Sequence, residues 1–187
     1  MSRTREQIYD ELLVLRCQDG ERDAFTDLAE RWQERLWRHA RRLSGDPELA
    51  NDAMQEAWMA IVRGIGKLHD PAFFRPWAYR IVTNKCADQV RRVSRRREVT
   101  EQMTRESPDD LEVPSVDTDE SDEISTLRSA MATLPTDRRT LLALHYLDEV
   151  SLSEIAVILG IPEGTVKSRL FNARKALKEA LERINHE

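Results

Sequence analysis

The stretch from 151 to 178, SLSEIAVILGIPEGTVKSRLFNARKALK, places the strongest constraint on how this chain folds. Ser151 and Glu154 match the S-x-x-E capping box that begins a helix. Gly160 can adopt the left-handed backbone that ends this helix, and Pro162 suits the first turn of another. Two helices joined by so short a turn predict a helix-turn-helix.

The second helix of this motif has two distinct faces. Apolar side chains recur at the helical period along one face, from Val166 to Leu181. The opposite face is polar and basic, with Ser168, Asn172 and Lys175 near its centre. A helix that enters the major groove of DNA needs such a face opposite a packed one. An ordinary solvated surface helix is the alternative, but the cap, the turn and the charged face together favour DNA binding.

The charges are distributed unevenly along the chain. The 187 residues carry a formal net charge of −5, which taken alone argues against a nucleic-acid partner. However, the segment 98–123 holds eleven acids and one Arg, so the acidity is confined to it. This segment also lacks helical periodicity, and its composition predicts a flexible acidic linker. We therefore expect an all-α protein with two small helical domains, at 1–97 and 124–187, joined by that linker.

Several functional classes are disfavoured by what the sequence lacks. No apolar run reaches the length of a membrane span, and residues 1–12 are too polar for a secretory signal, so we expect a cytoplasmic protein without membrane insertion. Cys17 and Cys86 lack ligand-spaced neighbours, which predicts free thiols rather than a disulfide or a metal site. The His residues are isolated, and no P-loop or pairing of a nucleophile with a base is evident. We thus expect no catalytic residues, no cofactor and no metal.

The first domain contains a polar cluster that helix formation alone does not explain. Apolar side chains at three- and four-residue spacing predict two long helices separated by a break at Gly45. Asp46 and Pro47 fit the N-cap and the first position of the second helix. The cluster lies in the first turns of that helix and could be merely solvated, or it could contact a basic partner surface. Its members are Asp52, Gln55 and Glu56.

Residues 69–76 are predicted to form a loop, followed by a helix that starts at Trp77. Aromatic side chains alternate there with cations and amides, a composition suited to single-stranded nucleic acid because bases stack on rings while cations bind phosphates. The alternative is that Trp77 and Tyr79 are amphipathic core residues. The five Arg residues between 91 and 97 give the helix a basic end that could follow a phosphate backbone.

Taken in order, these segments resemble a bacterial RNA polymerase sigma factor of the extracytoplasmic-function (ECF) subfamily of the sigma-70 family, whose members keep only the second and fourth sigma domains. DPELANDAMQEAWMAI is similar to the helix that binds core polymerase, with the polar cluster in its D-x-x-Q-E positions. FRPWAYRIVTNKCADQVRR is similar to the segment that melts the promoter and recognises the −10 element. EGTVKSRLFNARKAL is similar to the helix that recognises the −35 element. The resemblance covers nearly the whole chain outside the linker.

The resemblance implies a promoter-specificity subunit that directs transcription initiation and performs no catalysis. Its implied partners are promoter DNA, an anti-sigma factor, and core RNA polymerase through the β′ clamp helices and the β flap, with Asp52, Gln55 and Glu56 on the clamp helices. The loop before Trp77, together with Asn84, would capture an unstacked base of the −10 strand. The implied −10 contacts are Phe74, Arg75, Trp77, Tyr79, Arg80, Asn84, Lys85, Asp88, Arg91 and Arg92. The implied −35 contacts are Thr165, Lys167, Ser168, Arg169, Phe171, Asn172, Arg174 and Lys175.

Two positions depart from the family pattern. Pro76 stands where the family often has a small or polar residue, which stiffens the segment before Trp77. Asn172 stands where Arg is common, and because Asn pairs best with adenine and Arg with guanine, the −35 preference changes accordingly.

Two other classes of protein compete with this interpretation. A self-sufficient repressor or activator would dimerise and bind a palindromic operator through 151–178, which leaves the polar cluster and the aromatic helix unexplained. A helical adaptor or anti-sigma-like regulator without DNA contact would leave the basic face of 167–178 unexplained.

Overall fold

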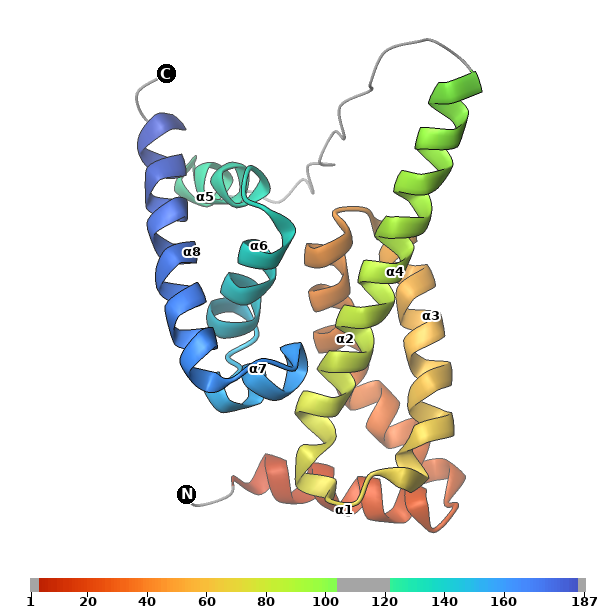
Figure 1. Cartoon of the computed structure of the whole chain (residues 1–187). Coiled ribbons are helices and arrows are strands. Elements are labelled where there is room, and N and C mark those ends of the chain that lie inside the picture. Colours follow the sequence, from red (N-terminus) through yellow and green to blue (C-terminus); the bar gives the residue numbers. More distant parts are fainter. Residues whose placement is uncertain (1–3, 104–121, 185–187) are drawn as a thin grey trace. The chain divides into compact units, whose positions relative to one another are not determined.

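The computed structural model describes residues 4–103 and 122–184, where every regular element is a helix (Figure 1). The chain divides into two compact units, Met1–Asp109 and Asp110–Glu187. The all-α prediction with two helical domains is therefore confirmed for the described residues. Most of the predicted linker, 104–121, lies outside them.

The predicted linker starts too early, because its first six residues continue the preceding helix. That helix, α4, extends to Met103. The sequence EVTEQM lacks an apolar stripe but contains Glu, Gln and Met, which favour helix without needing a packed face. Periodicity alone therefore misses this extension.

In the first unit, three long helices lie side by side and α1 crosses them near the connection between α3 and α4 (Figure 1). Asp46 begins α3 as predicted, since its Oδ1 accepts hydrogen bonds from the backbone N–H groups of Glu48 and Leu49 at 2.7 and 3.0 Å. Gly45 precedes it with φ +74°, a conformation that glycine adopts without strain. The elements are α1 Arg5–Gln18, α2 Arg22–Ser44, α3 Pro47–Gly64, η1 Ile65–Lys67, η2 Pro71–Phe73 and α4 Phe74–Met103.

Trp32 of α2 lies at the centre of this unit's core and contacts two other helices. Its indole N–H donates to Asp10 Oδ1 of α1 at 3.2 Å. Its ring makes edge contacts with Phe74 and Tyr79 of α4, with centroids 5.5 and 6.4 Å away. Beside it, the buried His39 ring lies 5.0 Å from Tyr79, and its Nε2 is 3.0 Å from Thr83 Oγ1. His39 is thus a structural residue of this core.

The segment predicted as the loop 69–76 is helical over most of its length. Asp70 caps η2 by accepting from the Ala72 N–H at 3.0 Å, and α4 begins at Phe74 rather than Trp77. Pro76 falls within the first turn of α4, where a backbone N–H has no intrahelical partner and proline is tolerated.

The second unit is built around the long helix α8, against which α5, α6 and α7 pack. The capping box is present: Glu154 N–H donates to Ser151 Oγ at 3.3 Å, and Ser151 N–H donates to Glu154 Oε2 at 3.0 Å. Gly160 ends α7 with φ +66°, which confirms the helix-turn-helix. The elements are α5 Asp122–Ala132, α6 Thr136–Leu142, the π-type turn η3 Ala143–Leu147, α7 Leu152–Leu159 and α8 Glu163–Ile184.

The sequence of α6 predicts Thr136 as its N-cap and an apolar face of Leu141, Leu144 and Leu147, and the structure differs at two points. Thr136 is the first helical residue, and Pro135 holds the cap position without a side-chain hydrogen bond. Leu147 does not share the face of Leu141 and Leu144, because it is exposed. The wide turn η3, closed by a bond from Asp148 N–H to Ala143 C=O at 3.0 Å, adds a residue and rotates Leu147 off that face.

Two adjacent leucines in α1 test the burial pattern of the first unit. Leu13 is 0% exposed and Leu12 is 48% exposed. We expect Leu13→Ala to lower the free energy of unfolding by about 2–5 kcal/mol, because it leaves a cavity. Leu12→Ala should change it by about 0.5 kcal/mol. Urea unfolding followed by Trp fluorescence measures both, since all four Trp residues lie in this unit; equal losses would contradict the packing described.

Candidate functional site

The exposed side of α3 carries a mixed acidic and apolar surface. Asp52, Gln55, Met59 and Val62 follow one another at spacings of three and four residues, so they share one helical face, and all four are exposed. We call this set the α3 face. The sequence prediction included Asp52 and Gln55 but missed Met59 and Val62. The sequence does carry a signal for them: Met59 and Val62 follow Gln55 at helical spacing, and they lie outside the apolar stripe of α3 that faces the core.

Glu56, the third member of the predicted cluster, turns toward α4 instead. Its Oε2 lies 3.0 Å from Lys85 Nζ and its Oε1 lies 2.8 Å from Arg92 Nη1. Gln89 Nε2 also donates to Oε1, at 3.1 Å. The Glu56 side chain is 25% exposed. Hydrogen bonds from Lys85 and then Arg92 hold the pKa of the Glu56 carboxyl below its usual value of 4.5, despite some desolvation.

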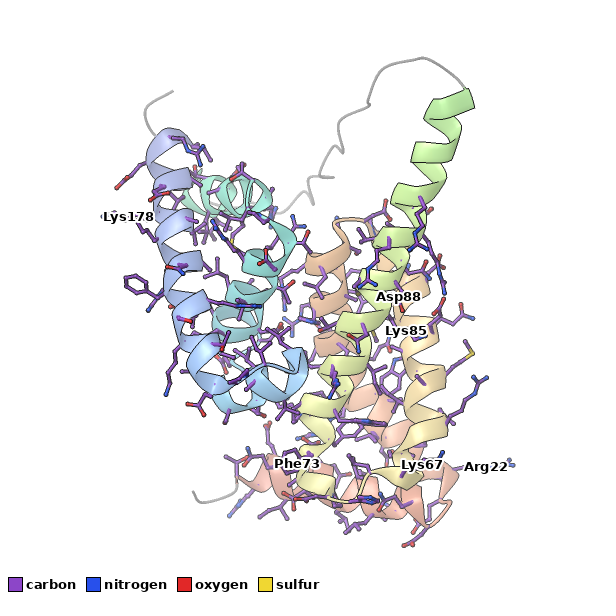
Figure 2. All side chains as sticks on the ribbon, in the orientation of Figure 1. Arg22, Lys67, Phe73, Lys85, Asp88 and Lys178 are labelled. Carbon is purple, nitrogen blue, oxygen red and sulfur yellow. The ribbon has the colours of Figure 1, made fainter. Side chains whose placement is uncertain are left out.

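The outward side of α4 is predominantly basic. Arg80, Asn84, Arg91 and Arg95 are exposed at spacings of four, seven and four residues, so they share one side of the helix, and we call them the α4 stripe. Asp88 lies among them, with its Oδ1 3.7 Å from Arg91 Nη1. Figure 2 labels Lys85 and Asp88 on α4, which runs alongside α3. Of the predicted −10 cations, Arg80 and Arg91 therefore belong to the α4 stripe, and Lys85 and Arg92 pair with Glu56. Arg75 belongs to neither group.

Two of the predicted −10 contacts belong to the core. Phe74 is 1% exposed and Tyr79 is 2% exposed, because both rings pack edge-on against Trp32. In this structure neither ring offers a free face on which a base could stack, so the geometry does not support the predicted contact for either residue. An aromatic ring fits a core and a stacking platform equally well, so residue type could not separate these roles.

Trp77 is half-buried at the start of α4. Its ring lies 6.2 Å from Phe74, centroid to centroid, and it packs over the backbone of Gly64 at the end of α3. A Cβ at Gly64 would stand 2.8 Å from Trp77 Cζ2, so only glycine permits this approach. Arg75 is half-buried close by. Phe73, which precedes Phe74 in the sequence, is exposed just before α4 (Figure 2), and the sequence prediction did not include it as a candidate contact.

The predicted −35 residues lie together on α8. Val166, Leu170 and Ala173 are buried against the rest of the unit, while Phe171 on the other side is 62% exposed. Thr165 is half-buried. The remaining predicted residues are exposed: Lys167, Ser168, Arg169, Asn172, Arg174 and Lys175.

The cations of this surface form only weak internal pairs. Lys167 Nζ lies 2.8 Å from Glu163 Oε1, and Lys175 Nζ lies 3.9 Å from Glu179 Oε1. Exposed pairs of this kind contribute about 0.2–1 kcal/mol, so a phosphate can displace them. Arg174 Nη1 also donates to Tyr146 Oη at 3.4 Å. We call this surface, from Thr165 to Lys175, the α8 face.

The part of the chain that the structure describes contains neither a metal-binding cluster nor a membrane-spanning helix. No group of three or more His, Cys, Asp or Glu side chains there could hold a metal ion. Among the helices of 4–103 and 122–184, none combines the length and apolar character that crossing a bilayer requires.

Comparison with known proteins assigns each unit to a sigma-70 region. The family model for Sigma-70 region 2 matches residues 28–96, and that for Sigma-70, region 4 matches 124–177. Over 183 residues the chain is 33% identical to the ECF RNA polymerase sigma factor SigW of Bacillus subtilis, covering 90% of this chain and 94% of SigW. The chain belongs to the ECF sigma factors.

Other relatives of this sigma factor agree over most of its length. It is 32% identical to the RNA polymerase sigma-H factor of Pseudomonas aeruginosa, covering 98% of both chains. Its fold is similar to that of CnrH in complex with the cytosolic domain of CnrY, with a TM-score of 0.69 and 24% identity over 93% of this chain and 97% of CnrH. The fold is also similar to that of RpoE of Bartonella quintana in complex with the anti-sigma factor NepR. The TM-score is 0.67, and the identity is 23% over 83% of this chain and 97% of RpoE. At these identities the two structures support the fold alone.

Substitutions at two glycines near the end of α3 test the packing of the Trp77 ring on Gly64. We expect Gly64→Ala to displace the Trp77 ring and to lower the free energy of unfolding by about 1–3 kcal/mol, the usual cost of overpacking. Gly66→Ala is the matched control, since nothing lies within 4 Å of its added Cβ. Near-ultraviolet circular dichroism and urea unfolding measure the two effects. A spectrum and a stability that are identical in the two variants would contradict the packing of Trp77 on Gly64.

The contacts of Glu56 with Lys85, Gln89 and Arg92 predict a pH dependence of stability. Because the folded-state pKa of Glu56 is depressed, its stabilisation is fully present above the unfolded-state pKa and is lost as pH falls through the folded-state pKa. We expect Glu56→Gln to cost about 1 kcal/mol at pH 7, a value that allows for the exposure of Arg92.

The difference between Glu56→Gln and the parent protein should shrink progressively below pH 4.5. Urea unfolding of both proteins across this range measures it. A difference that stays constant with pH would show that the carboxylate is not stabilised by the ion pairs.

Proposed function

We propose that this ECF sigma factor directs RNA polymerase to promoters through three surfaces, one on each of α3, α4 and α8. The observation that carries the proposal is that each helix packs one apolar side against its unit's core and exposes the other side. The exposed side is acidic and apolar on α3, predominantly basic on α4, and basic with the Phe171 ring on α8. The chain itself performs no catalysis and works in the cytoplasm with the polymerase.

The α8 face is proposed to bind the −35 duplex. Its cations suit phosphates, while Asn172 and the exposed Phe171 ring suit base edges, adenine for the amide and the thymine methyl group for the ring. Val166, Leu170 and Ala173 are buried on the opposite side of the helix. Their packing holds α8 in a fixed orientation, so the side chains proposed to contact bases project from a rigid helix.

The α4 stripe is proposed to bind and open −10 DNA. Its three Arg side chains would follow the phosphates of a single strand, with Asn84 free to bond to a base edge. Trp77 and Phe73 are the aromatic rings with exposed surface near the start of the helix, so they replace Phe74 and Tyr79 as the proposed stacking contacts. Lys85, Asp88, Arg92 and Arg75 border this surface.

The α3 face is proposed to dock on the β′ clamp helices of core polymerase. Two polar positions followed by two apolar ones fit a helical partner with a basic and an apolar section. The second unit is proposed to contact the β flap. CnrH and RpoE were each solved with a partner, CnrY or the anti-sigma factor NepR, and we propose by analogy that an anti-sigma factor also regulates this chain.

An operator-binding dimer is the main competing function, and co-purification distinguishes the two. The purified chain is mixed with core RNA polymerase, separated by size exclusion and tested by run-off transcription on genomic DNA. The sigma function predicts a stoichiometric complex that starts transcription at a defined promoter. A dimer that binds a palindromic operator and has no affinity for polymerase would overturn it.

A single cation on the α8 face tests the −35 proposal. We expect Lys175→Ala to weaken binding to all duplex sequences alike and to reduce the slope of log affinity against log salt by about one. Arg183→Ala is the control, because Arg183 is also exposed on α8 but lies two turns further on. Fluorescence anisotropy at several salt concentrations measures both variants. A loss confined to one base position would contradict a phosphate contact.

A further inference from the structure

The side chain of Gln18, the last residue of α1, is hydrogen-bonded to the connection between α3 and α4. Its Nε2 donates to the backbone C=O of Ile65 at 2.9 Å and to that of Leu68 at 2.7 Å. Carbonyl oxygens only accept, so the amide NH2 group must face them, and each of its two hydrogens has a partner. Gln18 is half-buried. One side chain therefore links α1 directly to residues 65–73, which we call the connection.

The end of α1 holds Gln18 in a fixed place. Gly20 has φ +86°, and its N–H donates to Cys17 C=O at 3.1 Å. Glu21 N–H donates to Arg16 C=O at 3.1 Å, and the Glu21 carboxylate lies 2.7 Å from Arg16 Nη2. These two backbone bonds form a Schellman motif, which closes the end of a helix. The backbone of Gln18 lies inside this closed end, so its amide projects from a rigid base.

Hydrogen bonds continue along the connection from Leu68 to Phe73. Leu68 ends η1, where its N–H donates to Ile65 C=O at 3.1 Å. Two residues later Asp70 caps η2, and Phe73 N–H donates to Asp70 C=O at 3.0 Å. Figure 2 labels Lys67 and Phe73, one in each of these turns, and both side chains are exposed. The position of the Leu68 carbonyl thus constrains where the Phe73 ring lies.

We propose that Gln18 is a positioning residue for the recognition of −10 DNA. It holds the connection in one conformation and so presents the Phe73 ring, which is 49% exposed, in one orientation. A ring that is already fixed loses less conformational freedom when a base stacks on it, so the stacking is stronger. The inference rests on the proposed function, in which Phe73 is a stacking contact. Gln18 acts through Phe73 and not through its own contact with DNA.

Gln18→Met tests the two bonds, because methionine keeps the unbranched length of the side chain and has no N–H donor. Gln7→Met is the matched control on the same helix. Gln7 is exposed in the first turn of α1, where it exchanges hydrogen bonds with Thr4 and not with the connection. Both variants are made in the full-length chain.

The first experiment measures amide hydrogen exchange and needs no polymerase. We expect Gln18→Met to speed exchange in the peptide 65–73 roughly tenfold, since two hydrogen bonds are lost, while exchange in α2 is unchanged. Gln7→Met should leave both segments as in the parent chain. Unchanged exchange in 65–73 would overturn the inference. Equal acceleration in α2 would also overturn it, because Gln18 would then stabilise the whole unit and not position the connection.

The second experiment asks whether Gln18 acts through Phe73. Permanganate footprinting at saturating core polymerase gives the rate of promoter opening for Gln18→Met, Phe73→Ala and the double variant. We expect Gln18→Met to slow opening roughly fivefold in the parent chain, a part of the usual stacking contribution, and by less than about twofold in the Phe73→Ala background. Equal slowing in the two backgrounds would overturn the inference.

Failure of the proposed function gives a different result from failure of the inference. If the parent chain opens no promoter with core polymerase, the proposed function is wrong, and the role of Gln18 toward −10 DNA is wrong with it. If the parent chain opens promoters and Gln18→Met opens them at the same rate, only the inference is overturned.

Discussion

The hydrogen bond and ring contacts of Trp32 fix the geometry on which the first unit depends. One indole joins α1 through Asp10 and α4 through Phe74 and Tyr79, so three helices share a single buried point. Because both α4 rings pack inward, the side chains on the opposite side of that helix must face outward. The α4 stripe is exposed as a consequence. The aromatic residues of α4 thus contribute to the proposed DNA surface by orienting the helix, and Trp77 is half-exposed because it lies at the edge of that packing.

The sequence was sufficient to predict the elements whose signals are local. A capping box, a glycine with positive φ and an apolar period each depend on a few neighbouring residues, and Asp46, Ser151 and Gly160 have the predicted roles. Errors arose where a tertiary contact decides the outcome. The aromatic pair Phe74 and Tyr79 fits either a core or a base-stacking surface, and only the position of Trp32 selects the core. The wide turn that exposes Leu147 likewise has no local signature.

The candidate site shows the same limit at the level of one residue. Gln55 and Glu56 are adjacent, so their side chains differ by about 100° around the helix axis. That rotation moves one to the solvent face and the other to the α4 flank, where Lys85 and Arg92 lie 29 and 36 residues away in sequence. A motif written as D-x-x-Q-E groups residues by order along the chain. The surface to which each residue belongs depends on the neighbouring helix, here α4. The periodicity of the α3 sequence carries no information about which helix packs beside it.

The proposed function also determines the symmetry of the target. A single recognition helix such as α8 contacts few base pairs, and each correct pair contributes about 1–3 kcal/mol of discrimination. Helix-turn-helix proteins commonly gain further contacts from a symmetry mate, which makes their operators palindromic. Here the additional contacts would come from α4, a different helix with a basic stripe suited to single strands. Two unlike surfaces cannot recognise two identical half-sites. The expected target is therefore asymmetric, a duplex −35 element at a fixed distance from a −10 element that is read after strand opening.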